Sequence, residues 1–114
     1  MKTIQKIIIT LSFITIGNIA FAHPPKNISV VYNPVNEEIT IFVDHYTNDP
    51  QTHYVEVISI SDEKSTLGIQ SFTKQASNEQ QVYKVILKDK KPGDSVEIYC
   101  KCNKLGKKRK VVIL

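Results

Sequence analysis

The stretch that decides the fold is S-V-E-I-Y-C-K-C-N, which spans residues 95–103. Its apolar residues and cysteines alternate with Glu, Tyr, Lys and Asn, which is the period-2 pattern of a half-buried β-strand. Side chains two residues apart on a strand share a face, so we expect Val96, Ile98, Cys100 and Cys102 to point toward the apolar side. The stretch therefore predicts a buried sheet face that brings one cysteine, at the end of the strand, to the rim of the domain.

Six further segments have the length and composition of short strands. They cover residues 27–32, 38–44, 53–61, 67–74, 81–88 and 109–114. Turn signals separate them, such as N-P-V-N at 33–36 and K-P-G-D at 91–94. No stretch shows an apolar 3.6-residue period with caps at both ends, so no helix is expected. The pattern predicts an all-β fold, an immunoglobulin-like β-sandwich of about seven strands that lacks the Trp of antibody domains.

The first 22 residues have the three parts of a secretory signal peptide. Lys2 and Lys6 form a short basic region, residues 7–22 carry no charge, and an A-F-A sequence then fits the cleavage pattern. The apolar run is too short and too polar for a membrane-spanning helix, and no later segment is apolar enough to be one. We therefore expect residues 1–22 to be a signal peptide and residues 23–114 to be one periplasmic or secreted domain, with no membrane span after cleavage.

Charge and motifs exclude several classes of function. The formal charge is +4, and removal of the signal peptide, which has two Lys and no acidic residue, leaves +2. A charge of that size predicts no particular partner, and nucleic-acid binding is not expected of an exported protein. The sequence has no G-x-S-x-G motif and, with four glycines in all, no glycine-rich phosphate loop. The basic cluster at 104–110 could steer an anion, but we interpret it as an ordinary soluble face.

The two cysteines are not expected to form a disulfide with each other. Residues two apart on a strand have Cα atoms about 6.5–7 Å apart, which is at the limit of what a disulfide can span. Cys100 is interpreted as a buried free thiol, because free cysteine is commonly buried. Cys102 lies at the strand end, where its sulfur could reach a metal site.

The three histidines of the sequence, His23, His45 and His53, are candidate metal ligands. His45 closes one predicted strand and His53 opens the next, so both imidazoles lie at one end of the sandwich if those strands face each other. Imidazole and thiolate bind iron, copper and zinc. Cleavage after residue 22 would make His23 the N-terminal residue, whose α-amine and imidazole can chelate one ion together. With Cys102, these residues predict a metal site; the alternative is that they never meet.

The segment 39–114 resembles the iron-binding domain of desulfoferrodoxin and of the neelaredoxin-type superoxide reductases, as a divergent relative. That family carries a histidine-containing loop that leads into His-His-Ile or His-Tyr-Ile, and here His45 precedes H-Y-V at 53–55. The family also carries a late C-N-x-H-G motif, which here reads C-N-K-L-G at 102–106.

The resemblance implies a seven-stranded immunoglobulin-like sandwich with ferrous iron bound by four equatorial histidines and one axial cysteine. His45 and His53 match two equatorial ligands, and Cys102 matches the axial thiolate. Leu105 stands where a third histidine is expected, and His23 is the one candidate for the fourth. The implied site keeps at most four of the five ligands. The implied activity is superoxide reduction, with superoxide and an electron donor as partners.

Three hypotheses of function follow. The first is a superoxide-reductase-like iron protein with an incomplete ligand set. The second is a periplasmic copper-binding module, because an N-terminal histidine on an exported sandwich also resembles copper-chaperone and histidine-brace proteins. The third is a metal-free immunoglobulin-like interaction domain.

Overall fold

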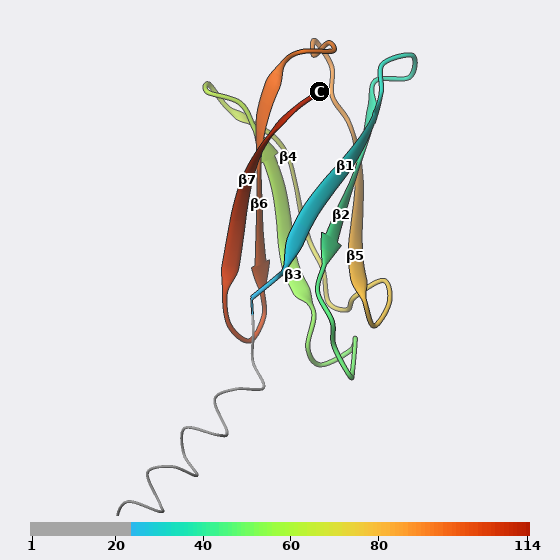
Figure 1. The fold of residues 1–114 in the computed structure, drawn as a ribbon, viewed down its shortest axis with the longest axis vertical. Coiled ribbons are helices and arrows are strands. Elements are labelled where there is room, and N and C mark those ends of the chain that lie inside the picture. The colour runs from blue at the N-terminus through green and yellow to red at the C-terminus, as the bar shows by residue number, and fades with distance from the viewer. Residues whose placement is uncertain (1–23) are drawn as a thin grey trace, which may run out of the picture.

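The computed structural model describes residues 24–114, which form seven strands and no helix (Figure 1). The strands are β1 (Asn27–Asn33), β2 (Glu38–Asp44), β3 (Val55–Ser61), β4 (Thr66–Ser71), β5 (Gln80–Ile86), β6 (Ser95–Cys102) and β7 (Lys107–Ile113). The predicted signal peptide and His23 lie outside the described residues. Residues 24–114 include no helix of the length and apolar character that crossing a bilayer requires.

The strands form two antiparallel sheets that pack face to face as a β-sandwich. One sheet has the order β1-β2-β5 and the other has the order β4-β3-β6-β7. Figure 1 shows the two layers running along the long axis of the domain. The predicted all-β, immunoglobulin-like sandwich of seven strands is therefore confirmed.

The core consists of the inward-facing side chains of both sheets. In β2, Ile39, Ile41 and Val43 are fully buried while the residues between them are only partly so. β6 shows the same alternation, and the inward residues predicted from its sequence, including both cysteines, are all buried. Burial of apolar surface stabilises a fold by about 25 cal/mol per Å², so the period-2 pattern fixes which face of each strand turns inward. Both cysteines are free thiols, as their spacing predicted.

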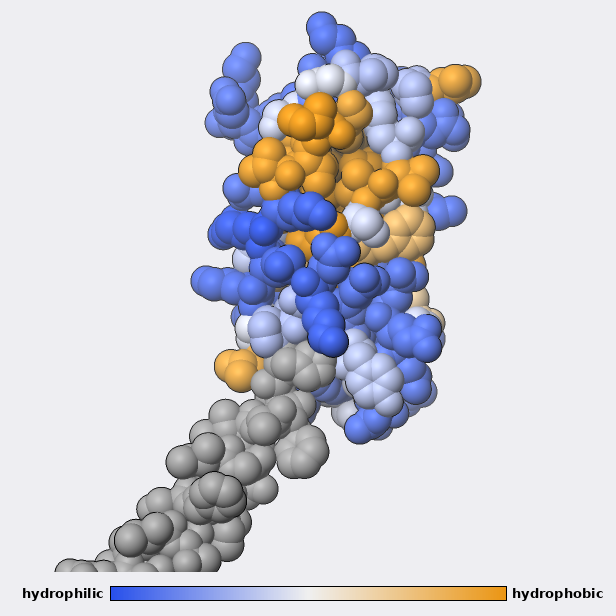
Figure 2. All heavy atoms as spheres, in the orientation of Figure 1, coloured by the Kyte–Doolittle hydropathy of each residue, from blue (hydrophilic) through white to orange (hydrophobic). Residues whose placement is uncertain are grey.

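The two sheets are also tied together along one edge, where β1 and β7 are neighbours. Lys110 on β7 donates a hydrogen bond from Nζ to the carbonyl oxygen of Ile28 on β1, at 2.8 Å. Figure 2 shows apolar side chains over the upper half of this face, where Val31, Val111 and Ile113 are exposed. Hydrophilic side chains cover the lower half, toward the end of the domain at which β2 and β6 terminate.

Three chain segments meet at that lower end of the sandwich. β2 ends at Asp44 in one sheet, whereas β3 begins at Val55 and β6 ends at Cys102 in the other. In the register of β3 with β6, Val55 lies opposite Cys102. The residues that follow β2, precede β3 and end β6 are therefore neighbours in space.

The expectation that the third strand begins at residue 53 was wrong. The backbone N–H groups of Thr52 and His53 both donate to the carbonyl oxygen of Asp49, at 3.2 and 2.9 Å, so His53 belongs to a turn. The pairing with β6 then shifts register between Val55 and Val57, as at a β-bulge. His53 is thus placed by a turn that strand alternation does not describe.

Burial of Cys100 predicts a loss of stability at alkaline pH. Burial raises the pKa of the Cys100 thiol from its ordinary value of 9.0 to about 11. Between these values the unfolded chain releases a proton that the folded chain retains, so the stability is complete below pH 9.0 and decreases as the pH rises toward 11. The Cys100→Ala variant should lack this pH-dependent loss of unfolding free energy. Urea unfolding of the wild type and the variant between pH 9.0 and about 11 would measure it. Parallel losses of stability in the two proteins would contradict the prediction.

Candidate metal centre

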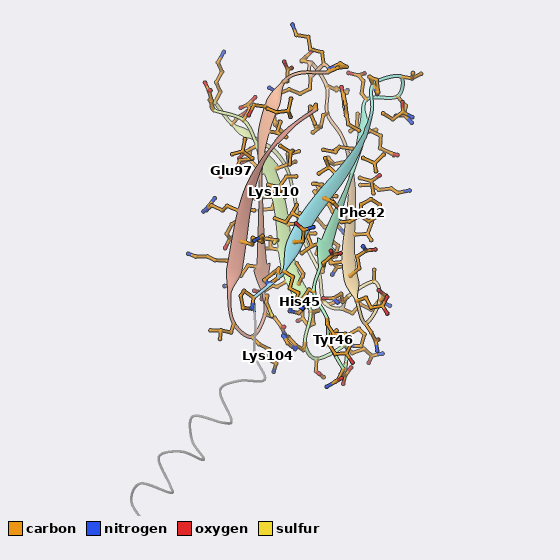
Figure 3. The ribbon with its side chains drawn as sticks, in the orientation of Figure 1. Phe42, His45, Tyr46, Glu97, Lys104 and Lys110 are labelled. Atoms are coloured by element: carbon orange, nitrogen blue, oxygen red, sulfur yellow. The ribbon has the colours of Figure 1, made fainter. Side chains whose placement is uncertain are left out.

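The structure brings together three of the four predicted site residues. His45, His53 and Cys102 each offer one ligand atom, and these atoms lie within 4.8 Å of one another. The rings of the two histidines meet edge to face, with centroids 4.8 Å apart and an interplanar angle of 88°. Figure 3 shows His45 at the end of the sandwich where Lys104, two residues after Cys102, also lies. The expectation that His45 and His53 lie at the same end is confirmed.

Cys102 is held at the end of β6 by the tight turn that follows it. Its N–H donates to the carbonyl oxygen of Gly106 at 3.0 Å, which closes the turn. Its sulfur lies 3.1 Å from Nε2 of His53 and 3.4 Å from the backbone nitrogen of Lys104, which donates to it. A buried sulfur that faces an imidazole and a backbone N–H has surroundings suited to a metal-bound thiolate, because N–H donors stabilise sulfur that carries negative charge.

His53 is held by the residue next to Cys102. The side-chain oxygen of Asn103 accepts a hydrogen bond from the backbone N–H of Tyr54 at 2.9 Å, and its side-chain nitrogen donates to the carbonyl oxygen of Thr52 at 3.0 Å. The backbone N–H of Asn103 also donates to the carbonyl oxygen of Tyr54, at 3.0 Å. One asparagine thus clamps the residues on both sides of His53 to the turn that carries Cys102. In the sequence, Asn103 stood out only as the second residue of the C-N-K-L-G motif at 102–106.

His45 is the most enclosed of the three residues, with 1 % of its surface exposed. Its backbone N–H donates to the carbonyl oxygen of Glu79 at 2.9 Å, and its ring Nδ1 lies 2.9 Å from the side-chain oxygen of Gln75. Gln75 lies in the connection between β4 and β5, which in the sequence is a polar segment without a motif. No local signal in the sequence could have identified this glutamine.

The other two candidate positions differ from the implied five-ligand site. Leu105, in the turn between β6 and β7, is 50 % exposed, and its side chain has no atom that can bind a metal. His23 lies outside the described residues. Pro24, which follows it, packs against the same turn, because a methyl group added at Gly106 would lie 2.7 Å from the Cα of Pro24. The start of the described chain therefore borders the turn that carries Cys102.

The donor set of the cluster fits a transition metal. Two imidazoles and one thiol are ligands for iron, copper and zinc, whereas calcium and magnesium prefer oxygen. The cluster consists of the two histidines and the cysteine that the resemblance implied as ligands, and Leu105, at the position where it implied a third histidine, offers no ligand atom. The cluster therefore could hold a metal ion.

Comparisons with known proteins support the fold. No family model matches the sequence, and no curated protein sequence matches it. Among solved structures, the chain is similar to a superoxide reductase (1Fe-SOR) from Giardia intestinalis, with a TM-score of 0.58 and 14 % sequence identity. The match covers 81 % of this chain and 100 % of that chain. At this identity the likeness shows a superoxide-reductase-like fold, and does not by itself show the site.

The contact between Pro24 and Gly106 can be tested against a second glycine. Gly106 and Gly93 have almost the same backbone angle, with φ of 93° and 94°, so alanine should cost each about 1–2 kcal/mol of unfolding free energy. Only Gly106 has a neighbour within 4 Å of an added methyl group. Gly106→Ala should therefore lose about 1–3 kcal/mol more than Gly93→Ala, measured by urea unfolding. Equal losses would show that Pro24 does not pack on this turn in solution.

Proposed function

We propose that this chain is an exported protein that binds one transition-metal ion through His45, His53 and Cys102, with iron as the first candidate. The observation that carries the proposal is the meeting of these three side chains at one end of a superoxide-reductase-like sandwich. Export rests on the signal-peptide pattern of residues 1–22, and it implies a periplasmic or secreted location.

Metal binding explains the cluster better than structural packing does. His45 and Cys102 are almost fully buried, although a polar ring costs free energy to bury unless its polar atoms are satisfied. The three side chains also come from parts of the chain that are far apart in sequence, and the side-chain amides of Gln75 and Asn103 hold the segments that bear the histidines. A metal-free interaction domain would need no such convergence.

Iron is favoured because the fold is like that of a one-iron superoxide reductase. A bound ferrous ion would supply one electron to superoxide, which with two protons becomes hydrogen peroxide, and an external donor would restore the electron. The residues of this chain would hold the ion and shape its surroundings. Because Leu105 replaces an implied ligand, metal binding is the primary proposal and superoxide reduction the activity to be tested on the loaded protein.

Copper is the second candidate, and a specific observation favours it. Two histidines and one cysteine are the donor set of trigonal copper sites in electron-transfer proteins. The described residues contain this set in the cluster of His45, His53 and Cys102. If export cleaves the chain after residue 22, the α-amine and ring of His23 would add donors that also suit copper.

The two cysteines give a matched pair of variants. The full chain is expressed, the processed protein is purified without a tag at its N-terminus, and bound metals are quantified. We expect close to one iron or copper ion per chain in the wild type and in Cys100→Ser, and a large loss in Cys102→Ser. If the bound ion is iron, a thiolate-to-iron(III) charge-transfer band should be present on oxidation in the first two proteins and absent from the third.

The identity of the ion separates the two candidates. Iron with the charge-transfer band supports the superoxide-reductase-like centre, whereas copper whose retention depends on a free N-terminal amine supports the copper module. Failure of the wild-type protein to hold or take up either Fe(II) or Cu(I) under anaerobic conditions would refute both, and would leave the interaction domain.

A further inference from the structure

Gln75 is a buried residue whose side chain and backbone make several hydrogen bonds at the candidate site. It is 3 % exposed. Its side-chain oxygen lies 2.9 Å from Nδ1 of His45 and 3.1 Å from the backbone nitrogen of Val55. Its side-chain nitrogen lies 2.6 Å from the carbonyl oxygen of His45 and 2.9 Å from that of Ser77. Its backbone N–H donates to the carbonyl oxygen of Pro50 at 2.9 Å.

These partners allow only one orientation of the Gln75 amide. The backbone N–H of Val55 can only donate, so the atom facing it must be the amide oxygen. The carbonyl oxygens of His45 and Ser77 can only accept, so the atom facing them must be the NH₂ group. A flipped amide would lose all three hydrogen bonds. It would place its NH₂ group against the N–H of Val55 and its oxygen against the carbonyl oxygens of His45 and Ser77.

The fixed amide in turn determines where the proton of His45 lies. The oxygen of Gln75 can only accept, so Nδ1 of His45 must donate and must carry the ring proton. In the neutral ring the lone pair is then on Nε2, because one ring nitrogen is a donor and the other an acceptor. A metal binds through the nitrogen that has the lone pair, so Nε2 is the ligand atom that His45 offers.

We propose that Gln75 is a positioning residue that locks His45 in the Nδ1–H tautomer and so prepares Nε2 to bind the metal. The binding of a metal by Nε2 rests on the function proposed above, whereas the tautomer of His45 is a property of the metal-free protein. Because Gln75 also binds the carbonyl oxygen of His45 and the backbone of Val55, it holds the ring and fixes its proton at once. Partners of this kind typically change metal affinity 10–100-fold when they are removed.

The chain offers a matched control in a second buried glutamine. Gln81 on β5 is 2 % exposed, and its side-chain nitrogen donates to the carbonyl oxygens of Val55 and Lys74 at 3.1 and 2.9 Å. These partners of Gln81 are backbone carbonyl oxygens, so its loss should weaken the same end of the fold without removing the acceptor that Gln75 presents to Nδ1 of His45. Gln75→Glu keeps an oxygen that can accept from Nδ1 of His45 and from the backbone N–H of Val55. Its second oxygen faces the carbonyl oxygens of His45 and Ser77, so this variant should lose stability while it keeps the acceptor that fixes the histidine proton.

The experiment measures the tautomer of His45 in the metal-free protein. Long-range ¹H–¹⁵N spectra of the processed full chain are recorded at a pH where the ring is neutral, for the wild type, Gln75→Leu, Gln75→Glu and Gln81→Leu. We expect the Nδ1–H form in the wild type, in Gln75→Glu and in Gln81→Leu, and its loss in Gln75→Leu. The Fe(II) affinity, measured in parallel, should fall about 10–100-fold in Gln75→Leu and stay near the wild-type value in Gln81→Leu.

An Nε2–H signal for His45 in the wild-type protein would overturn the proposal even if no variant folds. An unchanged tautomer in folded Gln75→Leu would overturn it as well. The spectra also separate this proposal from the proposed function. If the wild type shows the Nδ1–H form that Gln75→Leu loses, and yet binds no metal, the positioning role stands and the metal function fails.

Discussion

The meeting of His53 and Cys102 at the candidate site depends on the pairing of β3 with β6, in which Val55 lies opposite Cys102. Side chains alternate between the two faces of a strand, so a slip of one residue would turn Cys102 away from the interior. The pairing also sets the turn before β3 beside the turn after β6. His53 and Asn103, which lie just beyond the paired residues, are brought together for that reason, and their contacts follow from the register.

Two side-chain amides, one buried and one partly buried, position the histidines beyond the paired strands. Asn103 clamps the turn that carries His53, and Gln75 binds both the ring and the carbonyl oxygen of His45. Buried polar groups are stabilising only when their hydrogen bonds are made, and a partly satisfied network would be costly in a small domain. The chain places these groups at the end of the sandwich, and apolar side chains fill the space between the sheets.

The core and the candidate site occupy different parts of the domain. The core is formed by apolar side chains that alternate along the strands, whereas Leu105 is exposed in the turn between β6 and β7. The residue at position 105 therefore contributes little to the core. Function on such a scaffold is decided by the site and not by the fold. The likeness to a one-iron superoxide reductase therefore supports the architecture alone, and the candidate cluster rests on its own geometry.

Alternation and turn signals, which act over a few residues, were enough to predict the seven-stranded sandwich and the inward direction of Cys100 and Cys102. The role of residues 1–22 as a signal peptide stays a prediction. The shared end of His45 and His53 was expected only if their strands face each other, and the packing of the two sheets settles that condition. The placement of His53 in a turn, and the parts played by Gln75 and Asn103, also come from the tertiary structure. Their hydrogen bonds join residues 30 and 49 positions apart, and contacts at that separation leave no periodic pattern in the chain.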